Sequence, residues 1–228
     1  MNYYPYGKRL LDLILLGAIV LLMLLTAPLL LIFFAVLLVA HADGPLFFSQ
    51  IRAGLHNRPF RIYKFRTLKV NNMDRLSMGH VRHNHSMATP IGQFLRRLKI
   101  DELPQLWNIL LGEMSFIGPR PVYLEMTAEY TSEQAERLHV LPGLTGWSQI
   151  NGNCELTWDE RIRLDLWYVD HLSFWLDLKI LAATVGVLSQ GELINQDALA
   201  QADSYLEIRQ EDQHACSRPS AKEAILET

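Results

Sequence analysis

The sequence predicts a small, mainly helical α/β domain that is attached to a membrane through its N-terminal segment. Three observations predict this class: an almost wholly apolar segment at residues 10–40, a strongly basic block at residues 45–100, and helical periodicity through most of the remainder. The chain has 228 residues, of which 50% are hydrophobic and 20% are charged. This composition excludes a mostly disordered chain, and the length suits one domain with its own core.

The apolar segment predicts a re-entrant hairpin in the membrane. As a straight helix it would be roughly 46 Å long, against a hydrocarbon core of about 30 Å. Pro28 lies just past its middle, where the missing N–H kinks a helix, so we expect the break at Ala27 and Pro28. Lys8 and Arg9 precede the segment and the basic block follows it, and a hairpin places both positive flanks on the cytoplasmic side. A single tilted span and a cleaved signal peptide are the alternatives, but the run is about twice as long as a usual signal-peptide core.

Charge is strongly segregated along the rest of the chain, although the formal net charge is only −3. Residues 45–100 contain eleven Lys or Arg and one acid, whereas residues 192–228 contain eight acids and three bases. The basic block favours anionic partners, which are phosphates, nucleic acid or anionic lipid headgroups. Cys154 and Cys216 fit neither a disulfide framework nor a metal-ligand spacing.

The elements after the apolar segment follow from local patterns. Alternation predicts short strands at 45–50 and 60–66, and the polar residues 71–89 predict a loop. Apolar spacing then predicts a helix from 91, and a second helix after 101 that ends at Gly112. A capping-box pattern at 131–134 predicts a helix to about residue 140.

Two further helices, at 158–171 and 174–188, complete the predicted fold. The second of them is a candidate for an amphipathic helix in the membrane interface. The apolar face of the last helix packs either in the core or at the membrane interface, with Trp167 and Trp175 at headgroup level. We therefore divide the chain into a membrane-inserted segment (1–44), a folded domain (45–195) and a polar, acidic, loosely ordered C-terminal tail (196–228).

Asp101 and Glu102 are the candidate catalytic and metal-ligating pair. Pro104 is tolerated in the first turn of a helix, which predicts Asp101 at or near the N-cap and Glu102 just inside the helix. Free N–H groups at a helix N-terminus stabilise anions and lower the pKa of a carboxylate. Adjacent carboxylates also suit Mg²⁺, which typically binds one or two carboxylates together with substrate phosphates. The alternative is that Asp101 only caps the helix and Glu102 is solvated.

Other candidate binding residues lie on both sides of this pair. Arg120 stands between two prolines that hold its backbone, which suits a phosphate ligand, unless this run is only a rigid connector. Lys64 and Arg66 form a second cationic pair on a predicted strand edge. Gln149 and Asn151 lie in a turn-rich loop at 142–152, which either binds a nucleobase or packs as a connector.

Six features occur in a characteristic order: KRLLD at 8–12, the proline-broken apolar hairpin, YKFRT at 63–67, DELPQ at 101–105, GPRP at 118–121 and PGLTGWSQING at 142–152. In this combination the chain resembles the bacterial sugar transferases, the monotopic phosphoglycosyl transferases that begin polysaccharide and glycoprotein glycan assembly. The resemblance covers residues 6–188. One departure is the hairpin break, which is usually Ser-Pro in the family and is Ala27-Pro28 here. Thr26 stands one place earlier, where its hydroxyl can replace that of the serine.

The resemblance implies transfer of a sugar-1-phosphate from a UDP-sugar to polyprenyl (undecaprenyl) phosphate, with release of UMP, on the cytoplasmic face of the bacterial inner membrane. It implies a ping-pong reaction in which Asp101 attacks the β-phosphate and Glu102 binds Mg²⁺. Arg96 and Arg120 would then bind phosphates, with Lys64 and Arg66 as supporting cations.

The implied partners are the two substrates and membrane lipid, with no nucleic acid. The alternative function is a non-enzymatic, membrane-anchored protein whose basic block binds anionic lipid or a partner. No motif predicts the sugar, the downstream glycan or the oligomeric state.

Overall fold

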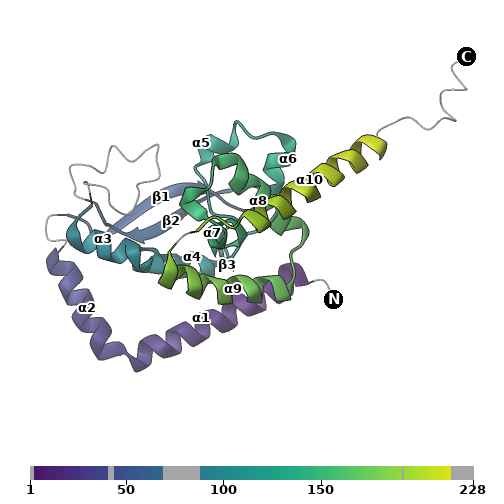
Figure 1. Ribbon diagram of the computed structural model, residues 1–228. Coiled ribbons are helices and arrows are strands. Elements are labelled where there is room, and N and C mark those ends of the chain that lie inside the picture. The colour runs from purple at the N-terminus through teal and green to yellow at the C-terminus, as the bar shows by residue number, and fades with distance from the viewer. Residues whose placement is uncertain (1–2, 41–43, 69–87, 192, 217–228) are drawn as a thin grey trace, which may run out of the picture.

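Helices dominate the computed structural model, which describes residues 3–40, 44–68, 88–191 and 193–216 (Figure 1). Two short two-stranded sheets complete the fold, so the predicted mainly helical α/β class is confirmed. The predicted loop at 71–89 lies almost wholly outside the described residues. The main core joins residues from both ends of the chain, including Leu16, Ile62, Ile117, Leu164 and Ile180.

The two sheets differ in how far the sequence predicted them. β1 (Phe47–Ala53) and β2 (Pro59–Phe65) pair antiparallel and confirm the predicted strands, although the first continues past Gln50. A short turn, η2 (Leu55–Asn57), connects them. β3 (Ser115–Ile117) and β4 (Gly143–Thr145) pair in parallel and were not predicted, because three residues are too few to show alternation.

The helices after residue 88 follow the predicted order, with short 3₁₀ segments between them. They are α3 (Pro90–Arg97), η4 (Ile100–Gln105), α4 (Leu106–Leu111), α5 (Leu124–Thr127), α6 (Ser132–Ala135), η5 (Glu136–His139), α7 (Trp147–Ile150), η6 (Asn153–Glu155), α8 (Trp158–Asp170), α9 (Phe174–Gln190) and α10 (Gln196–Cys216). Two predicted boundaries are confirmed. Gly112 ends α4 with a φ of 79°, and Thr131 and Gln134 form the capping box that begins α6.

The apolar segment forms two helices, α1 (Lys8–Leu25) and α2 (Ala27–Ala40), bent by 86°. The break falls at Thr26, whose hydroxyl donates to the carbonyl of Leu22 at 2.8 Å, and Pro28 lies in the first turn of α2. The carbonyl of Leu22 already accepts the backbone N–H of Thr26 at 3.0 Å, and the carbonyl four residues before Pro28 is that of Leu24, so the predicted replacement of the serine hydroxyl is not confirmed. Within the described part of the chain no single helix has both the length and the apolarity of a membrane span, whereas the bent pair has both together.

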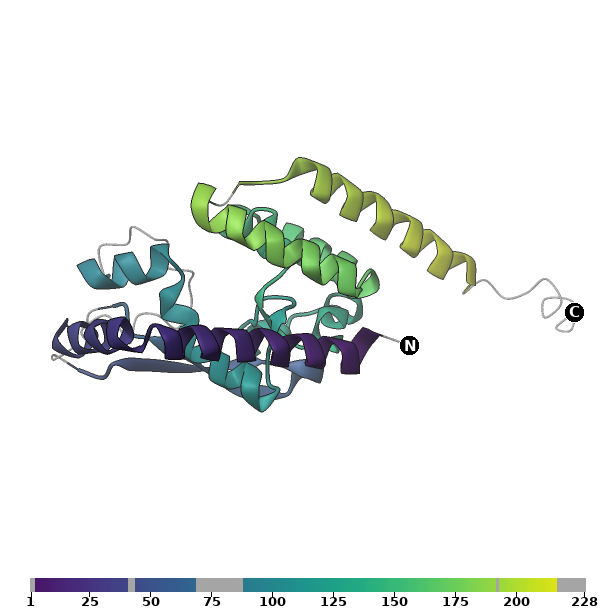
Figure 2. The ribbon, with the colours of Figure 1, turned by 90° about the horizontal axis from the view of Figure 1, so that it is seen from below.

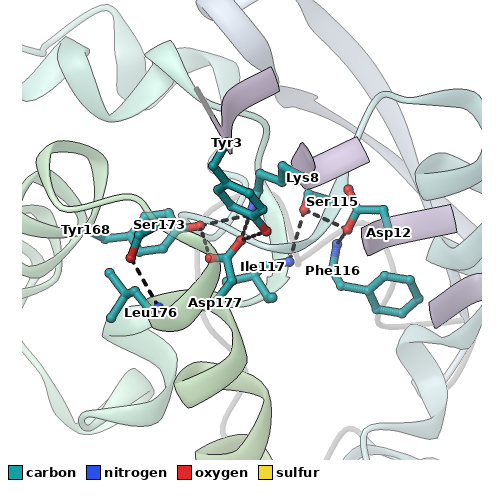
Figure 3. Close-up of polar contacts among 10 residues, drawn as sticks. All are labelled: Tyr3, Lys8, Asp12, Ser115, Phe116, Ile117, Tyr168, Ser173, Leu176 and Asp177. Atoms are coloured by element: carbon teal, nitrogen blue, oxygen red, sulfur yellow. Dashed lines mark hydrogen bonds and ion pairs between the residues drawn. The ribbon is translucent and has the colours of Figure 1, made fainter. Parts of the chain in front are cut away.

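The N-terminal end of α1 is fixed to the rest of the domain by a buried cluster of polar side chains (Figure 3). Lys8 Nζ donates to Asp177 Oδ2 at 2.5 Å and to the hydroxyl of Tyr168 at 2.9 Å. Asp177 also accepts from Tyr3 at 2.8 Å and from Tyr168 at 2.7 Å. Lys8, Tyr168 and Asp177 are all at most 1% exposed. We call these four residues the polar clasp.

Two further contacts fix α1 beside the clasp. Asp12 Oδ1 accepts from the hydroxyl of Ser115 and from the backbone N–H of Phe116, both at 2.9 Å, which ties α1 to β3. Arg9 donates to the carbonyls of Ile109 and Leu110 at 2.5 and 2.7 Å, which satisfies the C-terminal end of α4. The charged residues of the KRLLD run therefore all anchor the helix.

The far end of α2 also packs on the folded domain. Leu37 is buried in a small cluster with Phe65 of β2 and Leu95 of α3, and the rings of Phe34 and Phe65 lie 6.0 Å apart. Most of the apolar side chains between the two anchored ends are exposed, such as Leu24, Leu25, Leu29 and Leu31. The bent pair is therefore attached at both ends and bare in the middle.

The apolar face predicted on α9 is largely exposed, which contradicts its interpretation as core packing. Trp175 is 75% exposed and Val185 is 68% exposed, whereas the opposite side of the helix buries Asp177 and Ile180. Figures 1 and 2 show α1 and α9 running across the same lower face of the molecule. Trp167 was expected at this surface and is instead buried, because its ring stacks on Trp147 at 4.9 Å.

The prediction of a loosely ordered tail is wrong for residues 196–216, which form the helix α10. Ala198, Leu199, Ala202 and Leu206 are buried against the domain, mainly along α8. These residues recur at i, i+1, i+4 and i+8, a pattern that the polar composition of the segment concealed.

Candidate active site

Asp101 and Glu102 lie side by side in η4, between α3 and α4. The N-cap of this segment is Lys99, with a left-handed φ of 57°, so Asp101 lies near the N-cap, in the first turn together with Glu102, but is not itself the cap. The segment is a tight 3₁₀ turn that accommodates Pro104 before the α-helix starts at Leu106. Both carboxylates are nearly buried, with exposed fractions of 8% and 6%.

Glu102 is held by two cations that come from separate parts of the chain. Lys64 of β2 and Arg120 of the loop after β3 both approach its Oε1, at 2.6 and 2.8 Å. Burial alone would raise the pKa of Glu102, but the charges of Arg120 and Lys64 outweigh this effect and hold the pKa well below its usual range. Glu102 is therefore a fixed anion.

Asp101 behaves differently from its neighbour. Burial and the charge of Glu102 raise its pKa above the usual range, and the opposing charges of Lys64, Arg96 and Arg120 do not cancel this effect. The pKa decrease expected from a helix N-terminus is therefore wrong for Asp101. Its carboxylate has no hydrogen-bond partner among the residues that the structure describes, so its oxygens remain available to a ligand.

Arg120 is positioned by a close approach of backbones. The loop after β3 lies against β4, so that a Cβ on Gly118 would be 2.3 Å from the carbonyl oxygen of Leu141. Gly118 also donates from its N–H to the carbonyl of Thr145 at 2.9 Å. Only glycine fits at this position, and the prolines on either side of Arg120 then fix the direction in which its side chain leaves the loop.

Arg96 also belongs to this cluster, since its charge acts on both carboxylates. Its Nε donates to the hydroxyl of Thr67 at 2.7 Å. The structure therefore brings four predicted residues, Lys64, Arg96, Arg120 and Glu102, together with Asp101.

Three other predicted residues are engaged elsewhere. Arg66 is 2% exposed, and its guanidinium donates to the carbonyls of Pro45 and Leu68. Asn151 donates to the carbonyl of Trp147 and accepts from the amide of Asn195, so it connects the loop to the segment before α10. Gln149 is buried, and its Oε1 accepts from the hydroxyl of Ser148. These contacts favour packing roles for the two amides.

A pocket that the sequence did not predict lies beside Arg120. Its lining includes Arg52, Arg120, Arg137 and Arg161, with Asp165 as the single carboxylate. We call it the arginine pocket. Arg137 and Asp165 form a buried ion pair, and Asp165 also accepts from Ser148 at 2.7 Å. The contributing residues come from β1, η5 and α8, so no local spacing could have predicted them.

The donor set suits a magnesium ion only together with a substrate. No group of three or more His, Cys, Asp or Glu side chains in the described part of the chain forms a metal site by itself. Asp101 and Glu102 supply two adjacent carboxylates, one of them without a hydrogen-bond partner among the described residues. This number matches the few protein ligands that Mg²⁺ takes when phosphates complete its coordination.

The chain is similar in sequence to a known protein family and to several named proteins. The profile of the family described as "Bacterial sugar transferase" matches residues 3–191. The chain is 43% identical over 199 residues to the "Uncharacterized sugar transferase EpsL" of Bacillus subtilis, which covers 87% of this chain and 95% of that protein.

Other relatives have more specific names and greater lengths. A UDP-glucose:undecaprenyl-phosphate glucose-1-phosphate transferase of Xanthomonas campestris is 40% identical over 83% of this chain. A UDP-N-acetylgalactosamine-undecaprenyl-phosphate N-acetylgalactosaminephosphotransferase of Aeromonas hydrophila is 36% identical over 82% of it. The chain spans only 40% and 45% of these two proteins.

Proposed function

Because the chain belongs to the bacterial sugar transferase family, we propose that it transfers a sugar-1-phosphate from a UDP-sugar to undecaprenyl phosphate and releases UMP. The observation that carries the proposal is the convergence of Lys64, Arg96 and Arg120 on adjacent buried carboxylates. Relatives named for glucose and for N-acetylgalactosamine transfer share the matched region, so the proposal leaves the sugar open.

The chemistry proceeds in two displacements. A carboxylate oxygen of Asp101 attacks the β-phosphorus of the donor, and the bond between that phosphorus and the bridging oxygen breaks. The electron pair leaves with UMP, and an aspartyl phosphosugar remains. The phosphate oxygen of the lipid then attacks the same phosphorus and releases Asp101 as a carboxylate.

The surrounding groups suit these steps. Arg120 and Arg96 supply fixed positive charge near a transferring phosphoryl group, which stabilises the negative charge that accumulates there. Lys64 holds Glu102 in place at 2.6 Å. Asp101 has no hydrogen-bond partner among the described residues, so its carboxylate is available as the nucleophile. Because it is nearly buried, it also loses water contacts, which increases its reactivity.

Asp101 and Glu102 are the proposed magnesium ligands. When bound, Mg²⁺ would neutralise charge on the diphosphate of the donor. Glu102 suits this role because the charges of Arg120 and Lys64 hold its pKa well below the usual range, which favours the ionised form.

We further propose that α1 and α2 enter the membrane as a re-entrant hairpin, on the cytoplasmic side of the bacterial inner membrane. The polar clasp holds one end of the pair on the folded domain, and the packing of Leu37 against Phe65 and Leu95 holds the other. A segment with both ends on one domain cannot cross a bilayer once. The exposed apolar face of α9, which includes Trp175, suits the membrane interface beside it.

The alternative of an adhesive basic patch has less support. Such a function needs cations that face solvent. Arg58, Arg61 and Arg97 of the basic block do so, whereas Lys64 pairs with a carboxylate and Arg66 is buried. Arg96 acts on Asp101 and Glu102. Lipid adhesion would also give no reason to bury two acids among these cations.

UMP release from a panel of UDP-sugars tests the proposed reaction. Purified protein in detergent would be measured with and without Mg²⁺ and undecaprenyl phosphate. We expect release from a subset of donors in wild type and none from Asp101→Asn, while Asp159→Asn, which changes an exposed acid at the start of α8, keeps wild-type activity. Equal turnover in Asp101→Asn and wild type would exclude the nucleophile.

Cysteine accessibility in intact cells tests the proposed topology. Single cysteines at residue 6 and at residue 58 are both expected to react only from the cytoplasmic side. Labelling of the first from the periplasm would contradict the re-entrant hairpin.

A further inference from the structure

The charge of the arginine pocket is unusual for an enclosed space. Its lining contains four arginines and one carboxylate, and that carboxylate, Asp165, is already paired with Arg137. Arg52 makes no ion pair among the described residues; its guanidinium lies 3.6 Å from the centre of the Tyr123 ring and donates to Gln50 at 2.8 Å. A partly enclosed group of cations with so little compensation favours a multiply charged anion as ligand.

Unsatisfied donors point the same way. The Nε atoms of Arg52 and Arg137 are buried and have no hydrogen-bond partner within the part of the chain that the structure describes. A buried donor without an acceptor costs free energy, so such atoms are normally paired with protein, water or a ligand. Arg52 and Arg137 line the same pocket, so these donors indicate that an acceptor binds there.

The pocket is continuous with the proposed reaction centre. Arg120 lines it and also donates to Glu102 at 2.8 Å, so one guanidinium borders both sites. The charge of Arg52 acts on Arg120 and Glu102 as well, which places it near the same boundary. A molecule with its reacting phosphate at Asp101 would therefore extend past Arg120 into the arginine pocket.

The position and the lining of the arginine pocket indicate which of the two substrates binds there. The residues of the pocket come from β1, α5, η5 and α8, and Figure 1 shows α5 and α6 on the side of the molecule opposite to α1, α2 and α9. A lipid phosphate would approach from the apolar helices, whereas a soluble donor approaches from the opposite side. Val122, Met126 and Trp158 add apolar and aromatic surface to the charged walls, a mixture that suits a ligand with both a charged group and a ring.

We propose that the arginine pocket binds the nucleotide half of the donor, with Arg52 and Arg161 as binding residues for its phosphate. This inference rests on the function proposed above. In the first displacement the bond to the bridging oxygen breaks, and the negative charge of that oxygen stays on the departing UMP. Arg52, Arg120 and Arg161 would stabilise this charge, so the pocket holds the leaving group during the transfer and releases it afterwards.

Calorimetric titration of the full chain in detergent with UDP and Mg²⁺ tests this inference. Arg52→Gln and Arg161→Gln, from two different elements, are each expected to raise the Kd for UDP about 10- to 100-fold, because each removes a charge-assisted contact to phosphate. Arg58→Gln is the matched control. Arg58 is exposed in the connection between β1 and β2 and does not line the pocket, so the Kd of this variant for UDP should equal that of wild type.

Steady-state kinetics separate the two substrates. We expect both variants to raise the KM for the UDP-sugar and to leave the KM for undecaprenyl phosphate unchanged. A wild-type Kd for UDP in both variants would overturn the inference, as would a KM increase confined to the lipid. In either case the wild-type enzyme would still release UMP. Failure of the proposed function is a different result, in which wild type releases no UMP from any donor. Thermal unfolding shows whether each variant is folded.

Discussion

Replacement of Lys8 by methionine tests whether the polar clasp anchors the N-terminal helix. The change keeps the apolar stem of the side chain and removes one partner of an ion pair whose side chains are 2% and 0% exposed. Breaking a buried pair from one side typically costs about 3–5 kcal/mol, because the remaining charge stays buried. Asp177 would keep its hydrogen bonds from Tyr3 and Tyr168. We therefore expect the free energy of unfolding to fall by about 3 kcal/mol, the lower end of that range.

For a domain of this size, each kcal/mol shifts the Tm by about 2–4 °C, so Lys8→Met should lower the Tm by about 6–12 °C. Differential scanning fluorimetry in detergent measures the shift. Arg163→Met is the matched control, because Arg163 and Asp203 form a pair with 40% and 39% exposed side chains. Such a pair contributes at most about 1 kcal/mol. Equal Tm shifts in the two variants would show that the buried pair does not anchor the helix, whereas recovery of the Tm in the Lys8→Met, Asp177→Leu double variant would support the anchoring role.

Two further predictions concern the active site. Gly118→Ala places a Cβ 2.3 Å from a backbone oxygen and should displace Arg120, so we expect both the Tm and UMP release to fall, while Gly17→Ala, which meets no atom within 4 Å, lowers neither. The raised pKa of Asp101 predicts that the rate of formation of the aspartyl phosphosugar falls as the pH is lowered through that pKa, at a higher pH than for an ordinary aspartate. Glu102→Gln removes a charge that raises the pKa of Asp101, so the acidic limb of the residual rate should move to lower pH; a limb that stays in place would contradict this assignment.

The local parts of the fold were predictable from the sequence because each depends on nearby residues. The capping box at Thr131, the left-handed Gly112 at the end of α4 and the kink beside Pro28 all have short-range causes. The same applies to Asp101 and Glu102, whose adjacency makes them a pair in any fold.

What the sequence could not show depends on contacts between distant segments. Arg66 and Lys64 have the same charge and lie two residues apart, but only the folded structure shows that the guanidinium of Arg66 donates to the carbonyls of Pro45 and Leu68. The raised pKa of Asp101 follows from burial, which a helix-terminus argument does not include. The arginine pocket combines residues 52, 120, 137 and 161, which are far apart in the sequence. In α10 the buried apolar residues are few and stand among polar ones, so the sequence does not show an apolar face.

Intact-mass spectrometry can detect the proposed covalent intermediate on Asp101. The protein would be incubated with its UDP-sugar and Mg²⁺ in the absence of the lipid acceptor. We expect a covalent phosphosugar on wild type that maps to Asp101, disappears when undecaprenyl phosphate is added, and is absent from Asp101→Asn. UMP formation that requires the lipid, with no adduct at any time, would contradict the proposed intermediate, because the sugar phosphate would then pass directly from donor to acceptor.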